Sequence, residues 1–159
     1  MEPAPHPEAY GLFIGGANLD AATQKYTYFI IRQDGKYMIK RRAGADTPTV
    51  VDWTDHAAIK KPDSSGKMSN TLAVDVGKEK VRFLVNGTEV TSVDASKVDT
   101  AGTPGLRVNH NLNLHVEGFS VKTRYCFRRA RPAQVDVRRF WRISPGTSPT
   151  RRPLGLFLR

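Results

Sequence analysis

The segment Val81–Val93 constrains the fold of this chain more than any other stretch. At its centre lies Asn86-Gly87, the dipeptide that most readily adopts positive φ at both central positions of a type I′ turn. The two-residue loop fixes the register of the flanking runs, so that Phe83 faces Val90. Because side chains alternate between faces, one face is apolar and consists of Val81, Phe83, Val85 and Val90. We therefore predict an antiparallel hairpin that packs on a hydrophobic core.

Similar β-prone runs occur along most of the chain, separated by Gly, Pro, Asn and Asp. About nine short strands of this kind, with no sustained helical periodicity, are typical of an all-β sandwich or barrel. Besides the two strands of the hairpin, the segments are Tyr10–Ile14, Lys25–Arg32, Lys36–Arg42, Thr49–Trp53, Asn70–Val76, Gly105–Asn109 and Asn113–Val121. In the last one, a β-bulge near Glu117-Gly118 would bring its apolar residues onto one face.

The length of 159 residues suits one domain with a hydrophobic core of its own. Cys126 is the only cysteine, which excludes an internal disulfide and a zinc site built from several cysteines. No apolar run is long enough for a transmembrane helix. Residues 1–8 lack the basic and apolar regions of a signal peptide.

The formal net charge of +10 is concentrated at the C-terminal end of the sequence. Residues 1–123 contain 15 Lys and Arg against 14 Asp and Glu, whereas residues 124–159 contain ten Arg, no Lys and one acid, Asp136. This change of composition marks a boundary. We predict a β-sandwich domain at residues 10–122 and a disordered Arg- and Pro-rich tail at residues 123–159.

Three interpretations of the tail remain open. A basic arm would bind nucleic-acid phosphates non-specifically and with strong salt dependence. A segment of this composition is also typical of a disordered appendage. Translation out of the original frame would explain the abrupt change from Lys to Arg. We favour the last two together over nucleic-acid binding.

Several strand-and-turn segments, taken in order, resemble the concanavalin A-like lectin/glucanase (jelly-roll) superfamily. Within it, the likeness is closest to bacterial domains related to the 3-keto-disaccharide hydrolases, and it covers about Tyr10 to Val121. The segments that carry it are Tyr10–Gly16, Tyr26–Tyr37, Val51–Trp53, Asn70–Leu72, Val81–Gly87 and Gly105–Val108.

The resemblance implies an antiparallel β-sandwich of jelly-roll type and an exported or periplasmic protein. Domains of this family have further strands before the equivalent of Tyr10–Ile14, so the resemblance also implies that this chain is N-terminally truncated. A missing strand would leave an unpaired sheet edge or an uncovered core face. We therefore expect marginal stability or self-association through that edge.

The most polar β segment, Arg107–Glu117, is the first candidate for a saccharide site. Guanidinium, amide, imidazole and carboxylate groups can hydrogen-bond to sugar hydroxyls when an aromatic ring supplies an apolar platform. The candidate residues are Trp53, Arg107, Asn109, Asn113, His115 and Glu117, and Tyr26, Tyr28 and Tyr37 are further aromatic candidates. An exposed polar sheet face with aromatic packing is the simpler interpretation of the same pattern.

The acids and histidines give weaker candidates for catalysis. Glycosidases need a pair of carboxylates, and relatives on this fold carry a Glu-x-Asp-type run that is absent here. Asp52, close to Asp55, and His115 are the remaining catalytic candidates. His56 lies in the long loop Thr54–Ser69, a common place for a binding side chain. His110 and His115 have poor spacing for a shared metal, and we predict no metal site and no cofactor.

Three functions follow from these observations. The first is a non-catalytic carbohydrate-binding or interaction module, since the fold resemblance comes without a paired-acid motif. The second is a glycoside hydrolase of the 3-keto-disaccharide hydrolase kind. The third, non-specific nucleic-acid binding, depends only on the tail.

Overall fold

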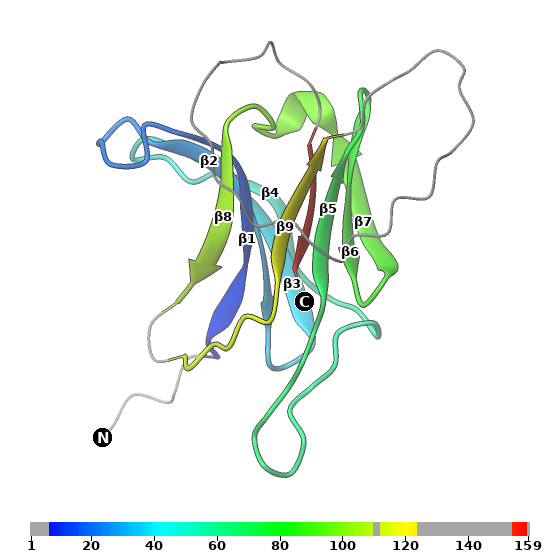
Figure 1. Cartoon of the computed structure of the whole chain (residues 1–159). Coiled ribbons are helices and arrows are strands. Elements are labelled where there is room, and N and C mark those ends of the chain that lie inside the picture. The colour runs from blue at the N-terminus through cyan, green and yellow to red at the C-terminus, as the bar shows by residue number, and fades with distance from the viewer. Residues whose placement is uncertain (1–6, 110–111, 124–153, 159) are drawn as a thin grey trace, which may run out of the picture.

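The computed structural model describes residues 7–109, 112–123 and 154–158. Within them the chain forms two five-stranded antiparallel sheets that face each other, with one short 3-10 helix, η1 (Ala95–Lys97) (Figure 1). The predicted antiparallel β-sandwich is therefore confirmed.

The first sheet has the strand order β4-β3-β2-β1-β8. Its strands are β1 (Ala9–Ala17), β2 (Lys25–Arg32), β3 (Lys36–Ala43), β4 (Thr49–Asp55) and β8 (Thr103–Val108). The first four follow one another as hairpins, and β8 returns to pair with β1. At the Asp34-Gly35 turn between β2 and β3, Gly35 has φ of 90° and its N–H donates to the Arg32 carbonyl. Only glycine adopts such a φ without strain.

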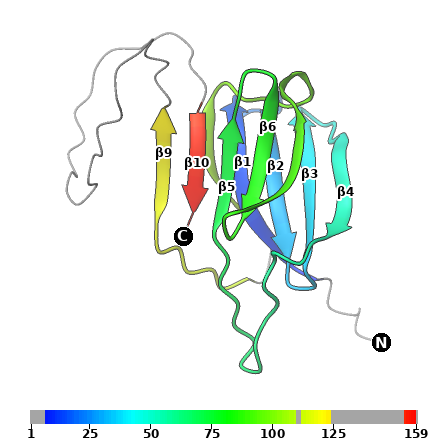
Figure 2. The ribbon, with the colours of Figure 1, turned by 90° about the vertical axis from the view of Figure 1, so that its right-hand side faces the viewer.

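The second sheet has the order β7-β6-β5-β10-β9 (Figure 2). Its strands are β5 (Leu72–Val76), β6 (Lys80–Val85), β7 (Thr88–Asp94), β9 (Phe119–Thr123) and β10 (Leu154–Leu158). β10 pairs with β5 on one side and with β9 on the other. Residues 154–158 of the predicted tail thus form one strand of the sandwich, and the prediction of disorder for residues 124–153 lies outside the described residues. The high arginine content of the tail led to a prediction of disorder, although Leu154–Leu158 is a run without charge. A run of this kind can form an interior strand.

The hairpin between β6 and β7 has the predicted turn but not the whole predicted register. Asn86 and Gly87 have φ values of 52° and 81°, as a type I′ turn requires, and Val85 pairs with Thr88. A β-bulge then shifts the ladder, so that Phe83 pairs with Thr91. The predicted pairing of Phe83 with Val90 was wrong, because the bulge adds one residue to β7.

The hydrophobic core lies between the two sheets. Phe29 on β2 and Phe83 on β6 meet with ring centroids 5.2 Å apart, and the Tyr37 hydroxyl donates to the Val90 carbonyl at 3.1 Å. The largest fully buried side chains among the described residues are Leu12, Thr27, Phe29, Ile31, Ile39, Leu72, Val74, Val81, Phe83 and Val85. The alternating residues of the sequence therefore do pack on one shared core.

The segment before β9 differs from its prediction. Residues 112–118 are irregular, and β9 begins only at Phe119, so the predicted strand Asn113–Val121 was wrong in its first half. The predicted bulge at Glu117-Gly118 was wrong for the same reason. Leu114 and Val116 pack at the margin of the core without strand pairing, whereas Phe119 and Val121 are each 41% exposed.

Candidate functional site

The side chains predicted to bind a ligand fall into two places. Asn113, His115 and Glu117 line a cavity at one end of the sandwich. Trp53 and Arg107 lie on the outer face of the first sheet, on its two opposite edge strands. The structure therefore divides the predicted saccharide site in two.

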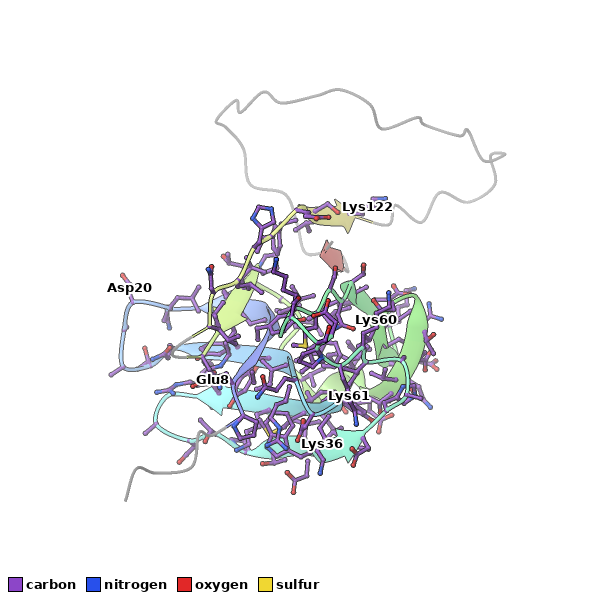
Figure 3. The ribbon with its side chains drawn as sticks, turned by 90° about the horizontal axis from the view of Figure 1, so that it is seen from below. Glu8, Asp20, Lys36, Lys60, Lys61 and Lys122 are labelled. Atoms are coloured by element: carbon purple, nitrogen blue, oxygen red, sulfur yellow. The ribbon has the colours of Figure 1, made fainter. Side chains whose placement is uncertain are left out.

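The cavity has a volume of about 520 Å³ and lies between the long loop before β5 and the segment before β9. Figure 3 looks onto this end of the sandwich and labels Lys60 and Lys61 on that loop. Two side chains from the first sheet and its turn complete the wall. The lining residues are Tyr10, Gln33, Pro62, 66–70, 112–115 and Glu117.

Two asparagines hold the base of the long loop beside this cavity. The buried Asn70 accepts a hydrogen bond from the Lys60 backbone N–H at 2.9 Å and donates to the Lys60 carbonyl at 3.1 Å and the Tyr10 hydroxyl at 3.4 Å. Asn86 donates to the Asn70 side-chain oxygen at 2.8 Å and to the Ala58 carbonyl at 2.7 Å. The turn of the second sheet therefore positions the loop that forms the cavity wall.

The tip of the loop has its own hydrogen bonds. One carboxylate oxygen of Asp63 accepts from the Ser65 N–H at 2.8 Å, the Ser65 hydroxyl at 2.6 Å and the Lys67 N–H at 3.1 Å. The Ser65 hydroxyl, followed by the two backbone donors, holds the pKa of Asp63 below its usual value. These bonds stabilise the turn that carries Lys67 and Met68 to the cavity.

The cavity lining combines hydrogen-bonding groups with apolar surface. Asn113, His115 and Glu117 are exposed, while Leu112 and Leu114 are half-buried against the core. Burial raises the pKa of the Tyr10 phenol more than the Asn70 hydrogen bond lowers it, so this phenol is neutral at neutral pH. An amide, an imidazole and a carboxylate beside apolar carbon can hydrogen-bond to a polyhydroxylated ligand.

The outer face of the first sheet carries a second apolar cluster, which we call the aromatic layer. It consists of Ala9, Tyr26, Tyr28, Ile30 and Met38, with the half-buried Phe13 and Trp53 packed against it. The Tyr26 ring lies 5.4 Å from that of Phe13 and 5.8 Å from that of Tyr28, measured between centroids. Of the predicted aromatic set, Tyr37 alone lies in the core.

Arginine side chains cover the aromatic layer. The Arg32 guanidinium lies 4.1 Å from the Trp53 ring centroid, and the Arg107 guanidinium lies 4.4 Å from that of Tyr28. Asn109, another predicted saccharide-binding residue, follows the end of β8, where its N–H donates to the Ala9 carbonyl. The outer face of the first sheet therefore combines aromatic rings with guanidinium groups.

The catalytic candidates take part in local interactions. Asp52 accepts a hydrogen bond from the Trp53 N–H at 2.8 Å, and Asp55 forms an ion pair with Lys36 at 3.6 Å. His56 accepts from the Ala58 N–H through Nδ1 at 3.2 Å. It lines a separate cavity of about 420 Å³ with Asp55, and His115 lines the larger one.

Residues 7–109, 112–123 and 154–158 contain no group of three His, Cys, Asp or Glu side chains arranged to hold a metal ion. His110 and Cys126, named in the sequence analysis, lie outside the described residues. None of the helices in the described part of the chain has the length and apolarity needed to span a membrane.

Asn70 and Asn86 are the site residues that sequence reasoning missed. The predicted role of Asn86 was confined to its turn, and its partners Ala58 and Asn70 lie 28 and 16 residues away. In the sequence both asparagines lie in polar turn segments, where an asparagine side chain usually bonds to backbone groups close by in the chain. Their type and position are therefore only a weak signal of hydrogen bonds to distant residues.

Comparison of the chain with protein-family models, with curated proteins and with solved structures finds no match.

Proposed function

We propose that this chain is a non-catalytic carbohydrate-binding module and that the saccharide occupies the cavity between the long loop and the segment before β9. The resemblance to concanavalin A-like domains, drawn from strand-and-turn segments of the sequence, is part of this proposal.

One observation carries the proposal. Three of the six predicted saccharide-binding side chains, Asn113, His115 and Glu117, line a single cavity of about 520 Å³. Small-molecule sites are typically concave, partly apolar and equipped with a few polar groups that fix orientation, in volumes of about 300–1,000 Å³. Leu112, Leu114 and Met68 supply the apolar part here.

The hydrogen-bonding capacity of the lining matches hydroxyl groups. A hydroxyl both donates and accepts, so it can pair with the Asn113 amide, either form of the His115 ring and the Glu117 carboxylate. This set of groups favours a neutral saccharide over a purely apolar ligand.

A glycan array probed with the full chain tests the proposal. We expect binding to at least one neutral oligosaccharide, weakened fivefold or more by Asn113→Ala and by His115→Ala. His56→Ala is the matched control, since His56 lines the other cavity, and it should bind as the unaltered chain does. Absence of binding to every saccharide, or equal losses in His56→Ala and His115→Ala, would contradict the proposal.

The hydrolase alternative has its own outcome. The full chain is incubated with 3-keto-disaccharides and the products are separated by chromatography. We expect no turnover above that of the buffer. Turnover that Asp52→Asn or His115→Ala abolishes would replace the binding module with an enzyme.

A further inference from the structure

The five arginines within the described residues differ in how their charges are balanced. Three of them pair with aspartates: Arg32 with Asp34 at 2.5 Å, Arg41 with Asp99 at 2.7 Å, and Arg82 with Asp75. Arg42 and Arg107 have no carboxylate partner among the described residues. The positive charges of Arg42 and Arg107 are therefore not balanced by a carboxylate within the described residues, and we call these two the unbalanced arginines.

Both unbalanced arginines lie on the outer face of the first sheet and approach the same strand. Arg42 on β3 is opposite Tyr26 in the β2–β3 register. Arg107 on β8 is opposite Gly11 of β1, which has no side chain, and reaches β2 beyond it. Its Nη1 donates to the Tyr26 hydroxyl at 2.9 Å, and its guanidinium lies over Tyr28.

The two charges act on one phenol. Burial raises the pKa of Tyr28, and both Arg107 and Arg42 oppose that rise through their positive charges. Lys40, opposite Tyr28 on β3, adds a third cation without a carboxylate partner in the described part of the chain. Like charges above an apolar layer repel one another, and an anion between them would remove that repulsion.

Unpaired hydrogen-bond donors on the same two arginines are a second, independent indication of a ligand. The Nε atoms of Arg42 and Arg107 are buried and have no hydrogen-bond partner within the described residues. Buried polar groups are normally paired, so each exception calls for a partner supplied from elsewhere or for a compensating interaction. A guanidinium donates in a fixed fork that matches the oxygens of a carboxylate, sulfate or phosphate group.

A hollow of about 320 Å³ adjoins Arg107, and its lining indicates which kind of molecule bears the anionic group. Its wall combines the Phe13 ring, the Gln24 amide, the Tyr26 ring and Arg107 with three aliphatic side chains, Leu19, Leu106 and Val108. Aromatic and aliphatic surface can pack against the C–H face of a sugar ring, and the amide can bond its hydroxyls. A bare inorganic ion would leave this surface unused.

We propose that the aromatic layer binds an acidic saccharide whose anionic group, a uronate carboxylate or a sulfate ester, is held by Arg42 and Arg107. This site is separate from the cavity of the proposed function, and the result for one does not decide the other.

The test is calorimetric titration of the full chain with trigalacturonic acid at about 150 mM salt, where exposed charges are screened beyond about 8 Å. The double variant Arg42→Gln/Arg107→Gln should weaken binding about tenfold or more, because it removes the charged hydrogen-bond donors that hold the anionic group. Lys78→Gln/Lys80→Gln removes the same charge from exposed positions in the β5–β6 turn and at the start of β6, and it should weaken binding less than twofold. This control accounts for the arginine-rich tail, which all variants retain.

Three further ligands separate the sources of the anion. The methyl ester of trigalacturonic acid should bind at least tenfold more weakly than the acid, and inorganic sulfate should also bind weakly. Comparison of galactose 6-sulfate with trigalacturonic acid shows whether the site prefers a sulfate ester or a carboxylate as the anionic group. Equal losses in the two double variants, equal binding of acid and ester, or inorganic sulfate binding as tightly as the saccharides would each overturn the proposal.

Loss of Arg107 exposes part of the aromatic layer and can impair folding. Near-ultraviolet circular dichroism of each variant checks this. Arg42→Gln alone and Arg107→Lys, which keeps the aliphatic stem and the charge, keep the test decisive. Both should weaken binding of trigalacturonic acid at least threefold, because each removes part of the guanidinium fork, and unchanged affinity in both would overturn the proposal.

Discussion

At the scale of single residues, Asn86 connects the fold to the cavity. It adopts φ of 52° in the turn, and its side chain accepts from the Thr71 N–H at 2.9 Å while donating to Ala58 and Asn70. The dipeptide Asn86-Gly87 was enough to predict the turn, because few residues tolerate this backbone conformation. The three side-chain bonds depend on tertiary contacts, so local sequence could not predict them.

Replacement of Asn86 by alanine should destabilise the protein by about 2–4 kcal/mol. Left-handed backbone strain costs about 1–2 kcal/mol and unsatisfied buried polar groups about 1–3 kcal/mol. Asn86→Gly removes the bonds but keeps the turn conformation, so it should cost less. Urea denaturation of the three proteins measures both differences. Equal stability of Asn86→Ala and the unaltered chain would show that the bonds carry no weight.

Asp34 makes a small, acid-sensitive contribution to stability. Its hydrogen bond from Arg32 lowers its pKa in the folded state. A lowered folded-state pKa stabilises the protein above the unfolded-state value of about 4. This stabilisation is lost as the pH falls through the folded-state pKa. Because the pair is partly exposed, we expect a contribution below about 1 kcal/mol.

The measurement is the melting temperature of the unaltered chain and of Asp34→Asn between pH 3 and pH 7. The difference between the two proteins should be largest at neutral pH and should shrink toward pH 3. A difference that stays constant over this range would contradict the assigned role of Asp34.

At the scale of elements, strands were predictable where side chains alternate regularly over a long segment. They were not predictable where tertiary packing determines whether a segment pairs with another strand. β2, with eight residues that alternate between two buried faces, has the predicted bounds. Residues 112–118 have a similar pattern, but their apolar side chains pack at the core margin without a strand partner. β10 lies in a segment that was predicted to be disordered from its overall charge, although the segment contains a short apolar run. Both errors concern pairing partners, which local sequence does not specify.

β10 provides a direct test at this scale. Leu156 pairs with Val74 on one side and with Val121 on the other, so proline at this position would remove a donor from an interior strand. We expect Leu156→Pro to destabilise the protein by about 3 kcal/mol or more. Leu156→Val keeps the donor and the strand preference and should cost much less. Equal stability of both variants in urea would contradict the assigned strand.

At the scale of the whole molecule, the edge strands β8 and β9 carry four of the five exposed large apolar side chains found among the described residues, and the fifth, Leu19, lies between β1 and β2. Leu106 and Val108 are 36% and 44% exposed, and Phe119 and Val121 are each 41% exposed. Self-association through an unpaired edge, expected from the sequence, stays a prediction. Four exposed apolar side chains on two edge strands are a natural place for a second copy to pair.

Sedimentation velocity measures this association. The mean mass of the full chain should rise with concentration, and Val108→Lys or Val121→Lys should reduce the rise, because a charge on an edge strand opposes pairing. Lys78→Gln is the control, since Lys78 lies in the turn between β5 and β6. A mass that is constant with concentration, or equal association of all variants, would contradict this prediction.

The two-sheet architecture was predictable from the sequence, whereas the site was predictable only in part. Residue type and alternation identified Asn113, His115 and Glu117, but Trp53 and Arg107 lie on the outer face of the first sheet. The division arises because residues 112–118 leave the sheet and turn toward the long loop. A sequence pattern shows which side chains share a strand face, but not where the strand ends.

The central claim is that the cavity binds a neutral saccharide. An amide chemical-shift titration of the full chain with an oligosaccharide selected on the glycan array tests it most directly. We expect the largest shifts at residues 66–70 and 112–117, and their loss in His115→Ala. Shifts confined to the outer face of the first sheet, or no shift at the cavity at saturating saccharide, would contradict it.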